Sequence, residues 1–199
     1  MKKTIITISR EFGSGGHFIG EEVAKRMNIP YYDKDIIFQI AEKTGYSESF
    51  IQEQSEYAPS KNLFAYAFVG RDRTGSSLSD QVYAAQTQVI RDLAQKGSCV
   101  IIGRCANMIL KDYSNVLRVF VYGDWDFRIR EASKKLSGTT KDIEKFMQKD
   151  DKRKEDFCKR FMGVDWADMT KYNLCLDNGT LGYEKCVEEI ESALEILKK

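Results

Sequence analysis

Apolar residues alternate along the chain between short continuous runs and runs at helical spacing. The continuous runs are rich in β-branched residues, which is typical of strands buried in a parallel sheet. We expect these strands at 4–9, 31–32, 98–102, 116–122 and 173–176. Amphipathic helices are expected between them at 19–27, 36–45, from 47 onward, at 82–96, 127–136 and 183–197, and over 142–161 as one long helix or two. Strands that alternate with helices predict a three-layer α/β/α domain with a parallel sheet of about five strands.

One segment breaks this alternation. Between Tyr57 and Asp80 the periodicity blurs, and Pro59, Gly70 and Gly75 interrupt it. A chain of 199 residues has the size of one domain. We therefore interpret the segment as a mobile insertion within a single domain over 1–199, rather than as a linker.

Composition and charge exclude several classes of protein. The formal net charge is +1, so a bulk electrostatic grip on nucleic acid or on an anionic membrane is not expected. The sequence contains no run of about 18 apolar residues, so no membrane span is expected. The N-terminus lacks the pattern of a signal peptide. The five cysteines are scattered without a CxxC pair, which indicates reduced thiols in a cytoplasmic protein. The only histidine is His17, which excludes a mechanism that needs two.

A glycine cluster follows the first predicted strand and consists of Gly13, Ser14, Gly15 and Gly16. Such a loop aims backbone N–H groups at an anion, and the helix behind it adds its partial positive charge, so we expect it to bind a phosphate. The match to a Walker A loop is incomplete, because Gly16 stands at the lysine position and no Ser or Thr follows it. The dinucleotide fingerprint is incomplete too, since Phe18 replaces its third glycine.

Charged residues follow other predicted strands. Asp33 comes after the second strand and is also a natural helix N-cap, and Arg104 comes after the third. Asp124 follows the fourth strand, where we favour a helix cap over a metal ligand. Ligands of parallel sheets bind beyond the carboxyl ends of the strands, so this edge is the expected site.

Several segments together resemble one known family. The opening ISREFGSGGHFIGEEVAKRMNIPYYD is similar to the first strand, glycine loop and tyrosine–aspartate segment of the cytidylate kinase-like proteins. Further on, IIGRCAN, DDKRKEDFCKRF and YNLCLDNGTLGYEKCVEEI resemble later segments of that family in the same order. The resemblance implies a P-loop kinase-like fold, an acceptor-binding insertion at about 34–96 and a lid at about 128–160.

The resemblance also implies a function and site residues. The function is ATP-dependent phosphoryl transfer, with Mg²⁺, to a nucleoside monophosphate of the cytidylate type or a similar small acceptor. Gly13, Ser14, Gly15 and Gly16 match the phosphate loop. Asp33 and Arg104 match residues that hold the acceptor. The arginines that match the lid and the helix after it are Arg128, Arg130, Arg153 and Arg160.

The basic residues in this region suit that chemistry. Residues 128–160 contain 12 basic and 7 acidic side chains in an otherwise nearly neutral chain. Phosphoryl transfer needs two aligned substrates and neutralised oxygens, and the planar fork of arginine pairs with phosphate oxygens bidentately. The alternative for such a segment is a solvated helix face.

The missing lysine leaves two questions open. Arg10, just before the loop, is the first candidate to supply the lost charge, and His17 is the second. His17 also fits a residue on the helix surface. A protein that binds nucleotides for regulation, without catalysis, remains the alternative function, and a dinucleotide-binding enzyme is a weaker one. The sequence names neither the acceptor nor the oligomeric state.

Overall fold

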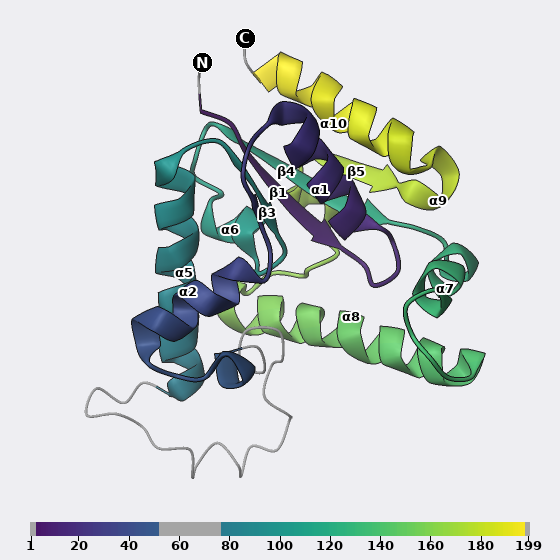
Figure 1. The fold of residues 1–199 in the computed structure, drawn as a ribbon, viewed down its shortest axis with the longest axis horizontal. Helices are drawn as coiled ribbons and strands as arrows, with labels where there is room; N and C mark the ends of the chain where they lie inside the picture. Colours follow the sequence, from purple (N-terminus) through teal and green to yellow (C-terminus); the bar gives the residue numbers. More distant parts are fainter. Residues whose placement is uncertain (1–2, 52–76, 198–199) are drawn as a thin grey trace.

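The computed structural model describes residues 3–51 and 77–197. Five parallel strands form one sheet in the order β2-β3-β1-β4-β5 (Figure 1). The strands are β1 (Ile5–Arg10), β2 (Tyr31–Tyr32), β3 (Cys99–Ile102), β4 (Val116–Tyr122) and β5 (Leu174–Asp177). The prediction of a three-layer α/β/α fold with about five parallel strands is confirmed.

The helices lie on both faces of this sheet and along one of its edges (Figure 1). They are α1 (Gly16–Met27), α2 (Asp35–Thr44), α5 (Leu78–Lys96), α6 (Ala106–Ile109), α7 (Trp125–Ser133), α8 (Thr140–Met162), η1 (Met169–Lys171), α9 (Asn178–Leu181) and α10 (Tyr183–Leu197). The short α6 and α9 were not expected from the sequence. The predicted helix over 142–161 is confirmed as one continuous helix, α8.

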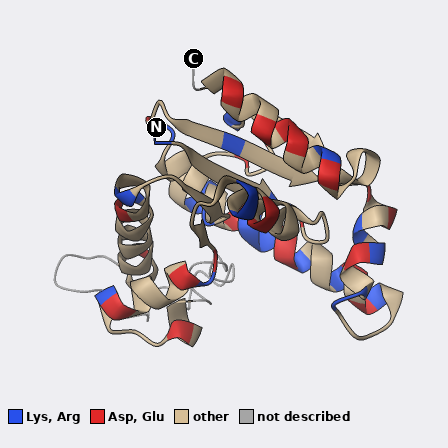
Figure 2. Ribbon diagram, turned by 45° about the horizontal axis from the view of Figure 1, so that its top comes forward, with Lys and Arg blue, Asp and Glu red and all other residues tan. Residues whose placement is uncertain are grey.

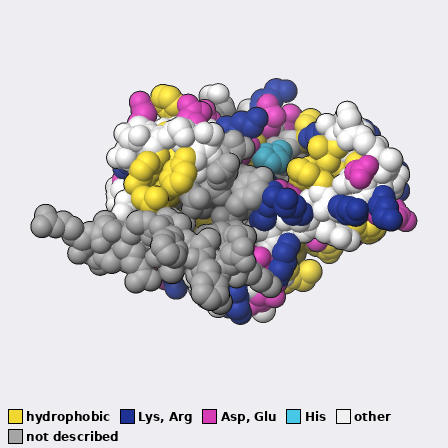
Figure 3. Space-filling view, turned by 90° about the horizontal axis from the view of Figure 1, so that it is seen from below, with side chains coloured by type: hydrophobic (Ala, Val, Ile, Leu, Met, Phe, Trp, Pro, Cys, Tyr) yellow, Lys and Arg dark blue, Asp and Glu magenta, His cyan; other side chains and the backbone are white. Residues whose placement is uncertain are grey.

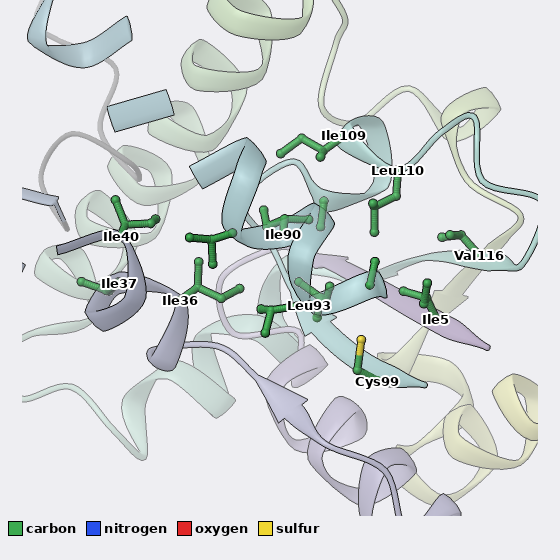
Figure 4. Packing of buried hydrophobic residues seen from close by; sticks show 14 of the residues in the cluster. Ile5, Ile36, Ile37, Ile40, Ile90, Leu93, Cys99, Ile109, Leu110 and Val116 are labelled. Atoms are coloured by element: carbon green, nitrogen blue, oxygen red, sulfur yellow. The ribbon is translucent and has the colours of Figure 1, made fainter. Parts of the chain in front are cut away.

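Alternating side chains of the strands build two cores. Ile6, Val100 and Leu117 face α1 and α10, whereas Ile5 and Cys99 face α2, α5 and α6. Figure 4 shows the second of these cores, in which buried isoleucines and leucines interdigitate. Each face of the sheet is therefore covered, which is the condition for an all-parallel sheet. The polar groups that follow the strands lie at the carboxyl ends of the sheet, above α8 (Figure 1).

Local signals set several helix ends as expected. Asp124 caps α7, because its side chain accepts a hydrogen bond from the Phe127 N–H at 2.8 Å. The interpretation of Asp33 as a helix cap is wrong: Lys34 takes the cap position of α2. The Asp33 side chain instead reaches His17, as described below. Most of the insertion expected at 57–80 lies outside the described residues, and its last residues begin α5.

The helices differ in the charge of their exposed side chains. Basic and acidic side chains alternate along α8, whereas acidic ones predominate on α10 (Figure 2). Among the described helices, none combines the length and apolar character that a membrane crossing requires.

Candidate functional site

A pocket of about 300 Å³ opens at the carboxyl edge of the sheet. Its size is at the lower end of the range for small-molecule sites. The residues that line it are Arg10, Glu11, Phe12, Gly13, Gly15, Gly16, His17, Asp33, Lys34, Ile37, Arg104, Glu131, Ala132, Lys135, Asp150, Lys154 and Tyr183. In Figure 3 the single histidine is visible on this face, with basic side chains beside it. The glycine loop, the ends of three strands and α8 thus meet around one space.

The glycine loop has the backbone of a phosphate cradle. Gly13 and Gly15 have φ angles of 79° and 84°, which glycine adopts at little cost. α1 begins directly at Gly16, so its first N–H groups and the positive end of its dipole face the pocket. Ser14 is fully buried and its hydroxyl donates to the Glu11 carbonyl at 2.9 Å, so its side chain shapes the loop. The loop therefore suits an anion bound by backbone groups.

Arg10 crosses the pocket beside this loop. A Cβ atom placed on Gly16 would lie 2.6 Å from the Arg10 Cβ, and one placed on Gly103 would collide with the guanidinium. Two glycines thus make the room that the arginine side chain occupies. Gly16 stands where a Walker loop carries its lysine, and the Arg10 guanidinium at the end of β1 places a cation beside it.

His17 and Asp33 extend this contact to the other side of the pocket. The Arg10 Nη2 and Nε atoms lie 2.9 and 3.3 Å from His17 Nε2, and His17 Nδ1 lies 3.1 Å from Asp33 Oδ2. Partial burial lowers the pKa of His17, and the Asp33 carboxylate opposes this. Burial favours the neutral Asp33 carboxyl, yet the His17 contact and the cations nearby hold its pKa below its ordinary value. His17 therefore lines the pocket and, with 45% of its side chain exposed, also lies at the surface of α1.

Arg104 lies directly after β3 and is 8% exposed. Its φ angle of 54° turns the chain sharply, and its carbonyl accepts a hydrogen bond from Gln86 at 3.1 Å. The guanidinium is one of the charges that lower the pKa of Asp33. Arg104 and Asp33 thus line the pocket together, beyond the ends of β3 and β2.

Lys154 is a pocket residue that the sequence analysis missed. Its ammonium lies 3.4 Å from the Arg10 carbonyl, 2.6 Å from Asp150 and 3.1 Å from Asp151. It lines this pocket and also a smaller neighbouring one that extends toward Cys158. α8 therefore delivers a lysine, rather than an arginine, to the phosphate loop.

The four arginines expected in the lid lie elsewhere. Arg128 is buried; it pairs with Glu11 at 3.3 Å and with Asp151, and it donates to the Phe12 carbonyl at 2.8 Å. Arg130 lies over the Phe127 ring, and Arg160 pairs with Asp80 at 3.5 Å. Neither they nor Arg153 belong to the residues that line the pocket. Their catalytic role stays a prediction, and Arg128 has an evident structural one.

Arg128 offers a direct test of that structural role. Arg128→Leu removes the cation that Glu11 and Asp151 share. We expect this to lower the free energy of unfolding by about 3 kcal/mol. Arg130→Leu removes an exposed guanidinium on the same helix and is expected to change stability by less than about 0.5 kcal/mol. Urea unfolding of both variants measures the difference. Equal stability of the two variants would contradict a structural role for Arg128.

The acidic side chains of the pocket are already held by the protein. Asp33 contacts His17, Glu11 pairs with Arg128, Glu131 with Lys134, and Asp150 with Lys154. Mg²⁺ sites need one or two available carboxylates besides phosphate oxygens and water. Within 3–51 and 77–197 no cluster of metal-ligating side chains is present. The described residues therefore do not form a protein-held Mg²⁺ site, whereas the loop and its cations do fit a nucleotide phosphate.

A comparison with known proteins finds a family match over most of this chain. The model of the cytidylate kinase-like family matches residues 5–180, which is most of the chain. The chain belongs to the cytidylate kinase-like family. A cytidylate kinase of Archaeoglobus fulgidus is 25% identical over 97% of this chain and 96% of its own length. Membership confirms the resemblance seen in the sequence.

Solved structures show the same fold. An uncharacterized protein from Eubacterium ventriosum shares 25% identity, covers 97% of this chain and 99% of its own, and superposes with a TM-score of 0.73. A gluconokinase from Sinorhizobium meliloti reaches 0.57 at 14% identity, covering 98% of this chain and 93% of its own. A shikimate kinase from Bacteroides thetaiotaomicron reaches 0.55 at 14% identity, covering 96% and 98%. At these identities the two kinases support the fold alone.

Proposed function

We propose that this protein transfers the γ-phosphoryl group of ATP to a nucleoside monophosphate of the cytidylate type. Family membership supports nucleotide-dependent phosphoryl transfer in general, and the name of the Archaeoglobus relative points to the cytidylate acceptor. The observation that carries the proposal is the pocket itself. It is lined by a glycine loop at a helix N-terminus, by two cations, Arg10 and Lys154, and by Asp33 and Arg104.

The donor side follows from the loop. Backbone N–H groups of 13–17 would bind the β- and γ-phosphates, and Arg10 and Lys154 would balance their charge. As the acceptor oxygen attacks the γ-phosphorus, the bond to the bridging oxygen breaks and ADP leaves with the electron pair. Negative charge is then spread over the equatorial oxygens, where fixed cations stabilise it most. ATP would bring Mg²⁺ on its phosphates, where the ion neutralises charge.

The acceptor side rests on Arg104 and Asp33. A guanidinium pairs with two oxygens of a monophosphate, and a carboxylate accepts hydrogen bonds from an amino group or a hydroxyl. The resemblance places the acceptor-binding insertion at about 34–96 and the lid at about 128–160. Part of that insertion lies outside the described residues.

One alternative is favoured by a specific observation. The loop has glycine at the position of the lysine that reaches the β- and γ-phosphates, and histidine at the position of the hydroxyl that binds Mg²⁺. A nucleotide-binding regulator without turnover would retain the same cradle. Such a protein binds ATP but forms no ADP with any acceptor.

An acceptor panel tests the proposal. The protein is mixed with ATP and Mg²⁺ together with CMP, dCMP, UMP or AMP, and ADP formation is followed. We expect ADP to form only when an acceptor is present, fastest with CMP or dCMP. ATP binding without acceptor-dependent ADP would favour the regulator, and the absence of ATP binding would overturn both functions.

Arg104→Ala tests the acceptor side. We expect the KM for the acceptor to rise about 100-fold while the KM for ATP stays within about threefold, because two charge-assisted hydrogen bonds are lost. Arg91→Ala, on the exposed face of α5, is the matched control. Steady-state kinetics with each substrate varied gives both values. A change confined to the KM for ATP would place Arg104 on the donor side instead.

A further inference from the structure

His17 connects the two sides of the pocket through both nitrogens of its ring. A guanidinium only donates hydrogen bonds, so His17 Nε2, at 2.9 Å from Arg10 Nη2, must accept. The proton of the neutral ring is then on Nδ1, which donates to Asp33 Oδ2 at 3.1 Å. Asp33 therefore selects the tautomer whose Nε2 lone pair faces Arg10.

Arg10 depends on this contact for its position. Its side chain lies in the space left by Gly16 and Gly103, which restricts it sterically but offers no side-chain acceptor. His17 supplies such an acceptor, at the position where a Walker loop has its hydroxyl. A fixed arginine loses less conformational freedom when phosphate binds than a free one.

We propose that His17 is the positioning residue that holds the Arg10 guanidinium at the phosphate-binding loop, with Asp33 fixing the orientation of the imidazole. The inference rests on the proposed function, because it assumes that the loop binds the phosphates of ATP. It assigns to His17 neither proton transfer nor direct contact with the nucleotide. The role follows from the two positions at which this loop departs from a Walker loop, because Gly16 replaces the lysine and His17 replaces the hydroxyl residue.

The arrangement works only while the imidazole is neutral. A proton on Nε2 would face the Arg10 guanidinium with a second donor, and the hydrogen bond would be lost. The charged and titratable groups around His17 are Arg10 of β1, Tyr31 of β2, Asp33 in the turn after it and Lys154 of α8. Burial and the two cations lower the pKa of His17, so the contact holds at neutral pH and is lost on acidification.

The ring can be observed directly, because His17 is the only histidine in the chain. In protein purified without a histidine tag, ¹⁵N-detected NMR of the imidazole reports its tautomer and pKa without any ligand. We expect the Nδ1–H tautomer and a pKa below the ordinary value. Arg10→Gln should raise this pKa and Asp33→Asn should lower it. An Nε2–H tautomer, or a pKa that does not respond to Arg10→Gln, would overturn the proposal.

Two substitutions separate the two ring nitrogens. The Gln side chain places an amide oxygen near the position of Nε2, whereas the Asn amide reaches only that of Nδ1. We expect His17→Gln to bind ATP within about threefold of the native affinity at pH 7.5, and His17→Asn to bind about tenfold more weakly. Lys25→Gln, on the exposed side of α1, is the control. Equal affinity of the Gln and Asn variants would contradict the proposed role.

The pH dependence gives the sharper result. Between pH 7.5 and 5.5 we expect the ATP affinity of the native protein to fall more than that of His17→Gln, by less than the loss seen in His17→Asn, because the lowered pKa leaves part of the imidazole neutral. Protonation of ATP affects both proteins alike and cancels in this ratio. A parallel fall would overturn the proposal. If no variant binds ATP, the proposed function fails, and the imidazole titration alone decides whether His17 holds Arg10.

Discussion

Arg10→Met is expected to lower kcat/KM by about 10²–10³-fold with little change in the fold. The guanidinium is the cation nearest the loop on the β1 side, and removal of one such donor from a transition state costs this much in other enzymes. Methionine retains the aliphatic contact with Gly16 and removes the charge. Steady-state kinetics and thermal unfolding of the same sample separate the two effects. Native-like turnover would show that Arg10 does not replace the missing lysine.

A double substitution sharpens this prediction. Arg10→Gly together with Gly16→Lys restores the GxxxxGK spacing of a Walker loop over 10–16. A lysine at 16 alone collides with the Arg10 Cβ, so Gly16→Lys should be inactive. The double variant should recover at least about tenfold of the activity lost in Arg10→Gly. Equal activity of Arg10→Gly and the double variant would contradict an exchange of charge between the two positions.

Lys154→Met is expected to lower kcat/KM by about 10²-fold, because the second cation of the loop is lost. Lys152→Met is a matched control on the same helix, since Lys152 is exposed and its ammonium pairs only with the partly exposed Glu155 and Asp156 among its described contacts. Lys154 also pairs with Asp150 and Asp151, so its removal can cost stability as well. Lys154→Arg keeps the charge and should stay within about tenfold of the native rate. Equal loss of activity in Lys152→Met and Lys154→Met would show that the charge of α8 matters but the place of Lys154 in the pocket does not.

The central strands were predictable from the sequence because burial on both faces leaves a plain signature. The run 116–122 coincides with β4, and 98–102 differs from β3 by one residue. The short α6 and α9 span four residues each, too few for periodicity to reveal. Asp33 fits the pattern of a helix cap. Its side chain contacts His17 instead of capping α2, because the end of β2 lies beside the start of α1.

The site was predicted in part. The glycine loop, Arg10 and Arg104 follow from their places after strands, whereas the lid arginines were assigned by resemblance. Helical spacing distinguishes the cations of α8 from one another. In α8 the buried residues are Ile143, Met147, Phe157 and Cys158. Lys154 falls within this stripe at helical spacing, while Arg153 and Arg160 fall about 100–120° away.

The contact between Arg10 and His17 had no such signal. The two residues are separated by the loop, and only the three-dimensional course of that loop brings the guanidinium back onto the imidazole. The position of Asp33 depends further on the strand order, in which β3 lies between β1 and β2. Residues 10–17 form one segment, but the pattern of residue types does not reveal how its loop turns.

Transfer of the phosphoryl group itself is the most direct test of the central claim. ³¹P NMR follows ATP, Mg²⁺ and CMP, with native protein and with Arg10→Met in parallel. We predict that the γ-phosphate signal of ATP declines as the β-phosphate signal of CDP grows in equal amount, and that Arg10→Met slows both about 10²–10³-fold. Release of inorganic phosphate without CDP, or unchanged spectra while ATP is bound, would contradict the assignment of this chain as a cytidylate-type kinase.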